Sequence, residues 1–332
     1  MKNIEMVYCG EILEDLFIEA KLKDYRDHRV AQKQNVGPYY KGYDIGAQRA
    51  NNGYPNQDLS IGIESWNSRI EDIDVRFYRS RELHDDSPCI VYIHGGGFTA
   101  GSLDAVENPC KRLAQLSASC VISLDYGLAP EHPFPIAINQ CKKVLDHLYE
   151  HSKDYRINKQ AIALSGDSAG GNIALSVAQL DAQEKKCISY LMLYYPVVDL
   201  SDSSASQAAL VNNETKHNSY IEACLSSLKG CEKQFRDCYL QGHNAEDNLV
   251  SPLYLTSLED LPPMIFCLGE FDYLRSSQVA FYEKFKHEHE IEMICYAGVN
   301  HAFLDKLGIF PQADVSLHKM AEKWKQRIME VL

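Results

Sequence analysis

From about Arg69 onward, the chain alternates short apolar runs with longer segments whose apolar residues have helical spacing. Short β-branched or apolar runs bounded by polar and turn residues are typical of buried strands. Strands that alternate with helices along a chain form a mostly parallel sheet covered by helices. The predicted strands are Ile73–Tyr78, Cys89–Ile93, Cys120–Asp125, Ala161–Ser165, Ser189–Tyr194, Met264–Gly269 and Glu292–Ala297, and the predicted helices are Asn108–Leu116, Ile136–His151, Ala169–Leu180, Ser276–His287 and Asp314–Leu332.

Two regions do not follow this alternation. Residues 1 to about 60 are rich in Tyr, Asn, Gly and charge, and are predicted to be irregular after a short helical start. Residues 201 to about 246 form an insertion, rich in Ser and Asn at first and then amphipathic through Ile221–Leu240. A long excursion from a compact α/β core is usually either a functional lid or a surface elaboration, and both of these are expected to cover one end of the sheet. We therefore expect a single domain over 1–332 with cap elements at about 1–60 and 201–246.

Composition and net charge restrict the kinds of molecule that the protein is expected to bind. The chain has 332 residues, of which 45% are hydrophobic and 24% charged, as in an ordinary globular protein. Its formal charge of −13 argues against nucleic acid or an anionic membrane as a partner, because both require a basic face. The first residues lack the apolar core of a signal peptide, and no stretch is long enough to span a membrane. We expect a cytoplasmic protein that acts on a small molecule; whether it forms a homodimer stays open.

The eleven cysteines give no metal or redox motif, since they occur singly and never as Cys-x-x-Cys. Most lie in apolar runs and are predicted to be small core residues. Cys224, Cys231 and Cys238 are spaced by seven, so a helix would place them on one face. We interpret them as the buried face of a cap helix rather than as a metal site, and we expect neither metal nor cofactor.

The segment "AIALSGDSAGGNIALSVAQL" carries the first chemical motif. Gly166-Asp167-Ser168-Ala169-Gly170 lies between a predicted strand and a predicted helix, which is the context of a nucleophile elbow. In that turn the serine side chain stands above the sheet. Because a serine hydroxyl needs a base to remove its proton, this interpretation requires a histidine and an orienting carboxylate downstream.

Both partners follow in the expected order, each directly after a predicted strand. "MIFCLGEFDYL" supplies Glu270 and Asp272, and "MICYAGVNHAFL" supplies His301. We favour Asp272 over Glu270 as the acid because it lies further into the turn after the strand. Three roles in the right order predict a Ser168, Asp272 and His301 triad. The remaining candidate histidines, predicted to lie on solvated helix faces or ends, are His287, His289 and His318.

A glycine-rich loop follows an earlier strand. Ester hydrolysis places negative charge on a carbonyl oxygen, which backbone N–H groups must stabilise. The N–H of Ala169, after the nucleophile, is one expected donor, and the loop His94-Gly95-Gly96-Gly97 is the expected source of the others. Glycines are expected there because side chains would stand between the substrate oxygen and the backbone.

With these motifs the chain resembles the hormone-sensitive-lipase family of α/β-hydrolases, which includes bacterial acetyl esterases and related carboxylesterases. The motifs that carry the resemblance are "HGGGF", "DYGLAPEHPFP", "GDSAGG", "FDYLR" and "NHAF", in this order over about 70–332. The family implies an α/β-hydrolase fold, a cap from the N-terminal segment and the insertion, and no cofactor.

The resemblance also implies a role for each loop residue. Gly96 and Gly97 would donate to the oxyanion together with Ala169, Gly95 would shape the turn, and His94 would brace the loop. The family uses the "DYGLAPEHPFP" segment to pack beneath the site. The chain departs from the family at two positions: Ala302 stands where members often have Gly, and Ser276 where they often have Asp. Both departures concern local geometry, since neither removes a catalytic group.

We therefore predict a serine carboxylesterase that hydrolyses short-chain, acetyl-like esters through an acyl-enzyme. An amidase or formamidase with the same triad is the first alternative. A non-catalytic small-ligand receptor on the same fold is the second, disfavoured because such receptors typically lose a triad member. Tyr39, Tyr40 and Tyr43 would wall a small acyl pocket in one interpretation, whereas packing within the cap is the favoured one.

Overall fold

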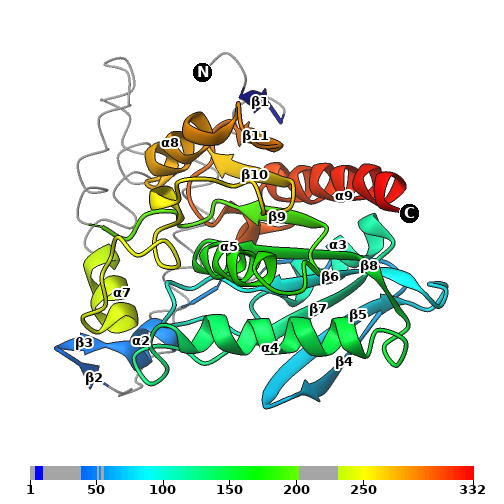
Figure 1. Cartoon of the computed structure of the whole chain (residues 1–332), viewed down its shortest axis with the longest axis horizontal. Coiled ribbons are helices and arrows are strands. Elements are labelled where there is room, and N and C mark those ends of the chain that lie inside the picture. Colours follow the sequence, from blue (N-terminus) through cyan, green and yellow to red (C-terminus); the bar gives the residue numbers. More distant parts are fainter. Residues whose placement is uncertain (1–3, 10–38, 51, 54–55, 202–230) are drawn as a thin grey trace.

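The computed structural model describes residues 4–9, 39–50, 52–53, 56–201 and 231–332 (Figure 1). Eleven strands and seven α-helices are defined within these residues. The strands are β1 Glu5–Val7, β2 Tyr39–Tyr40, β3 Tyr43–Asp44, β4 Ile63–Ile70, β5 Ile73–Ser80, β6 Ser87–Ile93, β7 Cys120–Asp125, β8 Ile157–Asp167, β9 Tyr190–Tyr194, β10 Met264–Gly269 and β11 Ile291–Tyr296; the helices are α2 Ile45–Ala50, α3 Glu107–Ser117, α4 Ile136–Glu150, α5 Ala169–Ala182, α7 Cys231–Leu240, α8 Arg275–Phe285 and α9 Pro311–Val331, with short 3₁₀ helices at Pro252–Tyr254 and Phe303–Lys306.

A nine-stranded sheet forms the centre of the molecule. Its order is β1-β11-β10-β9-β8-β6-β7-β5-β4. The pairs from β1 through β7 are parallel, and β5 pairs antiparallel with both β7 and β4. The predicted fold class, a mostly parallel sheet flanked by helices, is confirmed.

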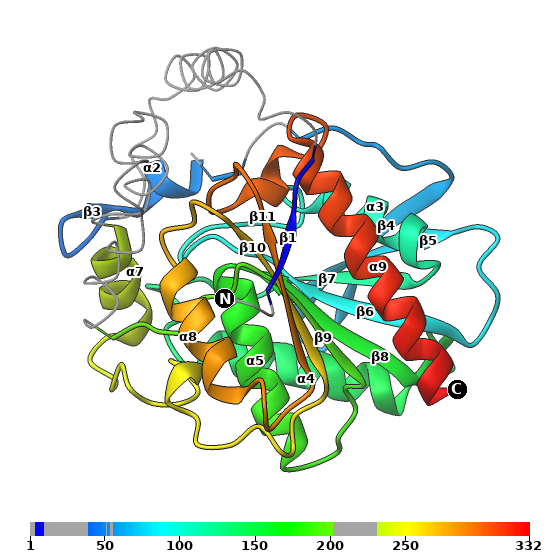
Figure 2. The same cartoon turned by 90° about the horizontal axis from the view of Figure 1, so that it is seen from above.

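Helices cover both faces of this sheet (Figure 2). The helices α4, α5 and α8 lie on one face, and α3 and α9 lie on the other. Each face has its own apolar layer: Val144, Ile173 and Phe281 belong to one, whereas Leu113 and Trp324 belong to the other. Because the central strands are buried on both faces, they are continuous apolar runs such as "CIVYI" in β6.

Two strands of the sheet were not predicted. One of them lies within the N-terminal region that was expected to form part of the cap. Glu5–Val7 is not part of a cap: it is the edge strand β1, and Val7 O accepts the N–H of Ala297 at 3.0 Å. Three residues are too few to show a strand period. The other, Ile63–Ile70, is an edge strand whose middle six residues are exposed, so it lacks an apolar alternation.

Parts of the two expected cap regions lie side by side at one end of the sheet (Figure 1). The hairpin β2-β3 and helix α2 contact α7, which is the described part of the amphipathic segment Ile221–Leu240. Tyr43 Oη donates to Asp237 Oδ2 at 3.3 Å, and Gln234 Nε2 donates to Gln48 Oε1 at 2.8 Å. Of the three cysteines spaced by seven, Cys238 is buried, and Cys224 and the side chain of Cys231 lie outside the described residues.

Candidate active site

Ser168 occupies a tight turn between β8 and α5. Its φ of 53° and ψ of −117° are in a region that side chains rarely adopt, which is the strained geometry of a nucleophile elbow. Gly166 and Gly170 permit this turn: a Cβ on Gly166 would lie 2.6 Å from the carbonyl carbon of Gly170, and one on Gly170 would overlap the carbonyl oxygen of Ile93. The expected strand, turn and helix are all present.

The three residues predicted as a triad are brought together by three different loops. Ser168 Oγ lies 2.8 Å from His301 Nε2, and His301 Nδ1 lies 2.8 Å from Asp272 Oδ2. Both His301 and Asp272 are buried. Asp272 is held in turn because its Oδ1 accepts the N–H of Leu274 at 2.8 Å. This chain of contacts can draw the proton from the serine hydroxyl.

Glu270 points elsewhere, because its Oε2 accepts the N–H of Gly298 at 3.0 Å. The other candidate histidines lie outside the site. His287 and His318 are exposed, and His289 Nε2 lies 3.0 Å from the carbonyl oxygen of Pro262. Only Asp272, of the two acids considered, contacts the imidazole of His301.

One departure from the family pattern, Ala302 in place of Gly, lies at a position whose backbone conformation favours glycine. It has a φ of 58° and a ψ of 34°, the left-handed conformation that glycine adopts without cost. For an alanine, this backbone conformation costs about 1 kcal/mol of free energy. The backbone turns there regardless, and His301 still reaches both of its partners. Ser276, the second departure, lies in the first turn of α8.

The loop after β6 has the backbone geometry that its glycines suggest. Gly96 and Gly97 have φ values of 123° and 61°. A Cβ on Gly96 would overlap the carbonyl oxygen of Ala100, so a side chain there would displace the loop. Ala169, the third expected donor, is the first residue of α5, where backbone N–H groups lack partners within the helix.

His94 supports this loop from beneath. Its ring is fully buried and stacks on Tyr126 at a centroid distance of 4.4 Å. His94 Nδ1 lies 2.8 Å from Gly95 O, and the Tyr126 hydroxyl donates to His94 O at 2.8 Å. Burial lowers the pKa of His94 to about 4, so the imidazole is neutral near pH 7 and its Nδ1–H donates to Gly95. Tyr126 belongs to the "DYGLAPEHPFP" segment, which therefore packs beneath the site.

A cavity of about 460 Å³ opens above these groups. The sheet end supplies Ser168, His301 and the glycine loop, while the expected cap regions supply residues from α2 and α7. Tyr40 and Tyr43 are not among its lining residues, which agrees with cap packing rather than an acyl wall, and the side chain of Tyr39 lies outside the described residues. The lining contributed by the cap includes Gln48, Asn52, Lys233, Phe235 and Arg236.

Asp167 is a residue of the site that sequence reasoning missed. It is buried, and its Oδ1 accepts both the Tyr92 hydroxyl and the Gly95 N–H at 2.9 Å. Burial, followed by the nearby carboxylate of Asp305, raises the pKa of Asp167 well above the usual range. The sequence signal was a lone acid at the end of an apolar strand, beside the nucleophile.

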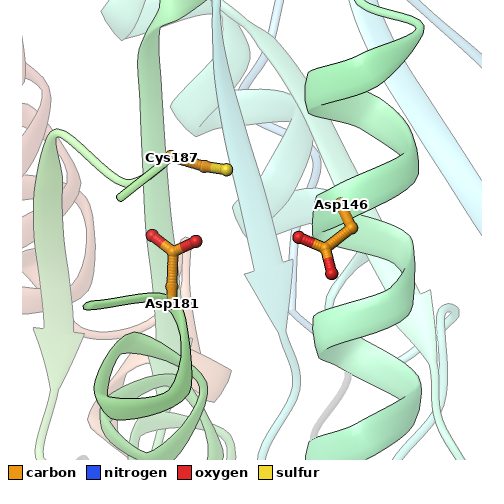
Figure 3. A group of neighbouring side chains, drawn as sticks. All are labelled: Asp146, Asp181 and Cys187. Atoms are coloured by element: carbon orange, nitrogen blue, oxygen red, sulfur yellow. The ribbon is translucent and has the colours of Figure 1, made fainter. Parts of the chain in front are cut away.

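One group of metal-ligating side chains is present among the described residues, away from the cavity (Figure 3). Asp146, Asp181 and Cys187 offer ligand atoms within 4.8 Å of one another. Lys142 Nζ lies 2.7 Å from Asp146 Oδ1 and 4.0 Å from Asp181 Oδ1, so an ammonium group of the chain already pairs with both carboxylates of this group. Asp181 lies near the C-terminus of α5, whereas Ser168 lies just before its N-terminus, so this group of side chains is not part of the site.

The fold and the site together define an α/β-hydrolase. A family model described as alpha/beta hydrolase fold matches residues 90–305. The chain is 32% identical over 235 residues to Carboxylesterase NlhH of Mycobacterium tuberculosis, covering 68% of this chain and 68% of that protein. The chain therefore belongs to the α/β-hydrolase family, and the resemblance to its hormone-sensitive-lipase branch is confirmed.

Solved structures share the fold. The hyperthermophilic esterase of the archaeon Pyrobaculum calidifontis has a TM-score of 0.73 and 25% identity, covering 94% of this chain and 98% of that one. The thermostable carboxylesterase EstE1 from a metagenomic library has a TM-score of 0.70 and 24% identity, covering 93% and 97%. The relatives bear out the predicted enzyme class, a carboxylic ester hydrolase.

Within the described part of the chain, no helix has the length and apolarity needed to cross a membrane.

Proposed function

We propose that the protein is a serine carboxylesterase in which Ser168, His301 and Asp272 are the catalytic triad. The observation that carries this proposal is the continuous chain of two 2.8 Å contacts from the serine hydroxyl through the imidazole to a buried carboxylate. Carboxylesterase NlhH and the esterases of similar fold support the ester as substrate. The cavity above Ser168 would hold it.

The reaction begins when Ser168 Oγ attacks the ester carbonyl and its proton passes to His301 Nε2. The Asp272 carboxylate, which accepts from His301 Nδ1–H, stabilises the resulting imidazolium. The protonated imidazole then gives its proton to the departing alcohol. Water, deprotonated by the same Nε2, attacks the acyl-enzyme; the bond from the acyl carbon to Ser168 Oγ then breaks, Nε2 returns the proton to Oγ, and the carboxylic acid is released.

The negative charge of each tetrahedral intermediate would be bound by the N–H groups of Gly96, Gly97 and Ala169. Two lie in the loop after β6, and the third is at the N-terminus of α5, where the helix dipole also favours an anion. His94 and Gly95 shape the loop and take no part in the chemistry. No cofactor takes part in this scheme.

A substitution of the nucleophile tests the proposal. Ser168→Ala removes Oγ, so hydrolysis of p-nitrophenyl acetate by the folded protein is expected to fall to the rate without enzyme. Circular dichroism and the melting temperature serve as controls for folding. Turnover equal to that of the wild type would show that another group carries the reaction.

The acid of the triad has its own matched test. Asp272→Asn leaves the geometry similar but disturbs the histidine tautomer, so kcat is expected to fall by about 10⁴-fold. Glu270→Gln changes the neighbouring acid in the same way and is expected to leave kcat near that of the wild type. Both variants are assayed on p-nitrophenyl butyrate. A large loss of kcat in Glu270→Gln with little loss in Asp272→Asn would show that Glu270 is the acid of the triad.

We also propose that the acyl group is short, as in acetyl esters, and that the enzyme acts in the cytoplasm. Rates on p-nitrophenyl esters from acetate to dodecanoate test the first point. Parallel assays on formamide substrates distinguish an esterase from the amidase alternative. A receptor without catalysis would leave Ser168 unlabelled by a fluorophosphonate.

A further inference from the structure

One buried carboxyl group joins the nucleophile elbow to the glycine loop. Asp167 ends β8 immediately before Ser168, and its side chain crosses to the neighbouring strand β6 and the loop that follows it. There Oδ1 accepts the N–H of Gly95 and the hydroxyl of Tyr92, each at 2.9 Å. The two segments that the proposed mechanism needs in register are therefore connected through this group.

Gly95 is held on both sides of its backbone. Its N–H donates to Asp167, and its carbonyl oxygen accepts from His94 Nδ1 at 2.8 Å. A Cβ on Gly95 would overlap Asp167 Oδ2, so the carboxyl group lies directly against this residue. The N–H of Gly96 lies in the same peptide plane as the carbonyl group of Gly95, so its direction depends on how Gly95 is held.

We propose that Asp167 is a positioning residue for ester hydrolysis, which fixes the loop donors relative to Ser168 by accepting the N–H of Gly95. This inference rests on the proposed function, since a positioning role requires that the loop binds the oxyanion. Without the acceptor, the Gly95 N–H would lose its buried partner, and the loop would settle in other orientations. A donor even 1 Å out of place loses much of its effect on the transition state.

The positioning role of Asp167 requires an oxygen atom that accepts a hydrogen bond, but it does not require a negative charge. Asp167 lies in a buried site near the carboxylate of Asp305, and both surroundings disfavour its ionised form. A neutral carboxyl group still has a carbonyl oxygen that accepts hydrogen bonds. An asparagine amide offers the same oxygen at the same distance along the side chain.

The test compares Asp167→Ala with Asp167→Asn by steady-state hydrolysis of p-nitrophenyl butyrate. Rates are expressed per active site titrated with a fluorophosphonate, so unfolded protein is not counted. For Asp167→Ala we expect kcat to fall by about 10²-fold, the loss typical of one oxyanion donor, with KM changed by less than about threefold. Asp167→Asn is expected to keep kcat within about fivefold of the wild type.

Asp181→Ala is the matched control, because Asp181 is equally buried and accepts a backbone N–H, that of Ile188, at 3.0 Å. It should lower the melting temperature without lowering kcat. If Asp167→Ala does not fold, Asp167→Ser takes its place, because its hydroxyl is too short to reach Gly95. Wild-type kcat in the alanine or serine variant, or equal losses in the alanine and asparagine variants, would overturn the inference. Absence of hydrolysis by the wild type would instead contradict the proposed function.

Discussion

His94 shows how a single buried side chain can support the loop of the site. Its ring is fully buried between Tyr126 and the loop, and Gly101 packs so closely that a Cβ there would overlap His94 Nδ1. A charged imidazolium in this position would lack solvent, which is why burial lowers its pKa to about 4. The support that His94 gives to Gly95 is therefore that of a neutral ring.

This pKa predicts a component of acid sensitivity that belongs to His94. The unfolded chain has the ordinary value of 6.5, so it binds a proton more readily than the folded protein does. The contribution to stability is complete above about pH 6.5 and is lost as pH falls towards 4. Between pH 7 and pH 5, the free energy of unfolding should drop by about 2 kcal/mol from this source alone.

Urea unfolding at the two pH values measures this component when the wild type is compared with His94→Phe. Phenylalanine keeps the stacking on Tyr126 but cannot titrate, so its free energy of unfolding should fall less between pH 7 and pH 5. Equal losses in both proteins would mean that His94 does not titrate in this range.

At the residue scale, order along the chain was enough to predict Ser168, Asp272 and His301, because each follows a recognisable strand. It did not reveal Asp167. The second position of a Gly-x-Ser-x-Gly motif carries no rule of its own, and the contact with Gly95 arises only when β8 and β6 pair. The position of Asp272, further into the turn after its strand than Glu270, was also enough to favour it, and the structure places Asp272 against His301 and Glu270 against Gly298.

Among the elements that the structure describes, α7 packs against the glycine loop at the cavity. Phe235 lies in the middle of this helix, and its ring carbons lie 2.6 to 2.8 Å from where a Cβ on Gly97 would stand. Both residues line the cavity. Arg49 of α2 holds the neighbouring cap element to the core, since its Nε donates to Thr99 O at 2.8 Å and its guanidinium pairs with Glu131.

We expect Phe235 to limit the length of the substrate that fits the cavity. Phe235→Ala should raise kcat/KM on p-nitrophenyl octanoate relative to butyrate by roughly tenfold, since added apolar contact is worth 1 to 3 kcal/mol. Phe235→Trp should move the same ratio in the opposite direction. Ratios unchanged in both variants would place the limit on chain length elsewhere.

Elements with a strong apolar pattern were predictable, and those without one were not. The central strands and the helices that cover them were found within a few residues of their bounds, because burial on both faces gives continuous apolar runs. The exposed edge strand β4 has no such run, and its pairing with β5 is decided by tertiary structure. The same holds for β1, whose three residues gain their partner from β11.

At the scale of the whole molecule, the two apolar layers share one sheet. Ile90 and Tyr92 of β6 face one layer, and Val91 and Ile93 of the same strand face the other. Alternate residues of one strand thus contribute to both layers. We propose on this ground that residues 1–332 form a single domain.

Calorimetry tests the single domain. Heating should give one cooperative transition whose calorimetric and van't Hoff enthalpies agree. The Ser168→Ala variant, which cannot hydrolyse added ester, should show the same single transition. Two resolved transitions would mean that a cap folds as a separate unit.

The proposed triad is tested most directly by covalent labelling of Ser168. Incubation with a fluorophosphonate, followed by intact-mass and peptide mass spectrometry, should show one adduct per chain, located on Ser168, with loss of esterase activity in proportion to labelling. The Ser168→Ala variant should remain unlabelled. An adduct on another residue, or full activity in protein labelled at Ser168, would contradict a mechanism based on Ser168, His301 and Asp272.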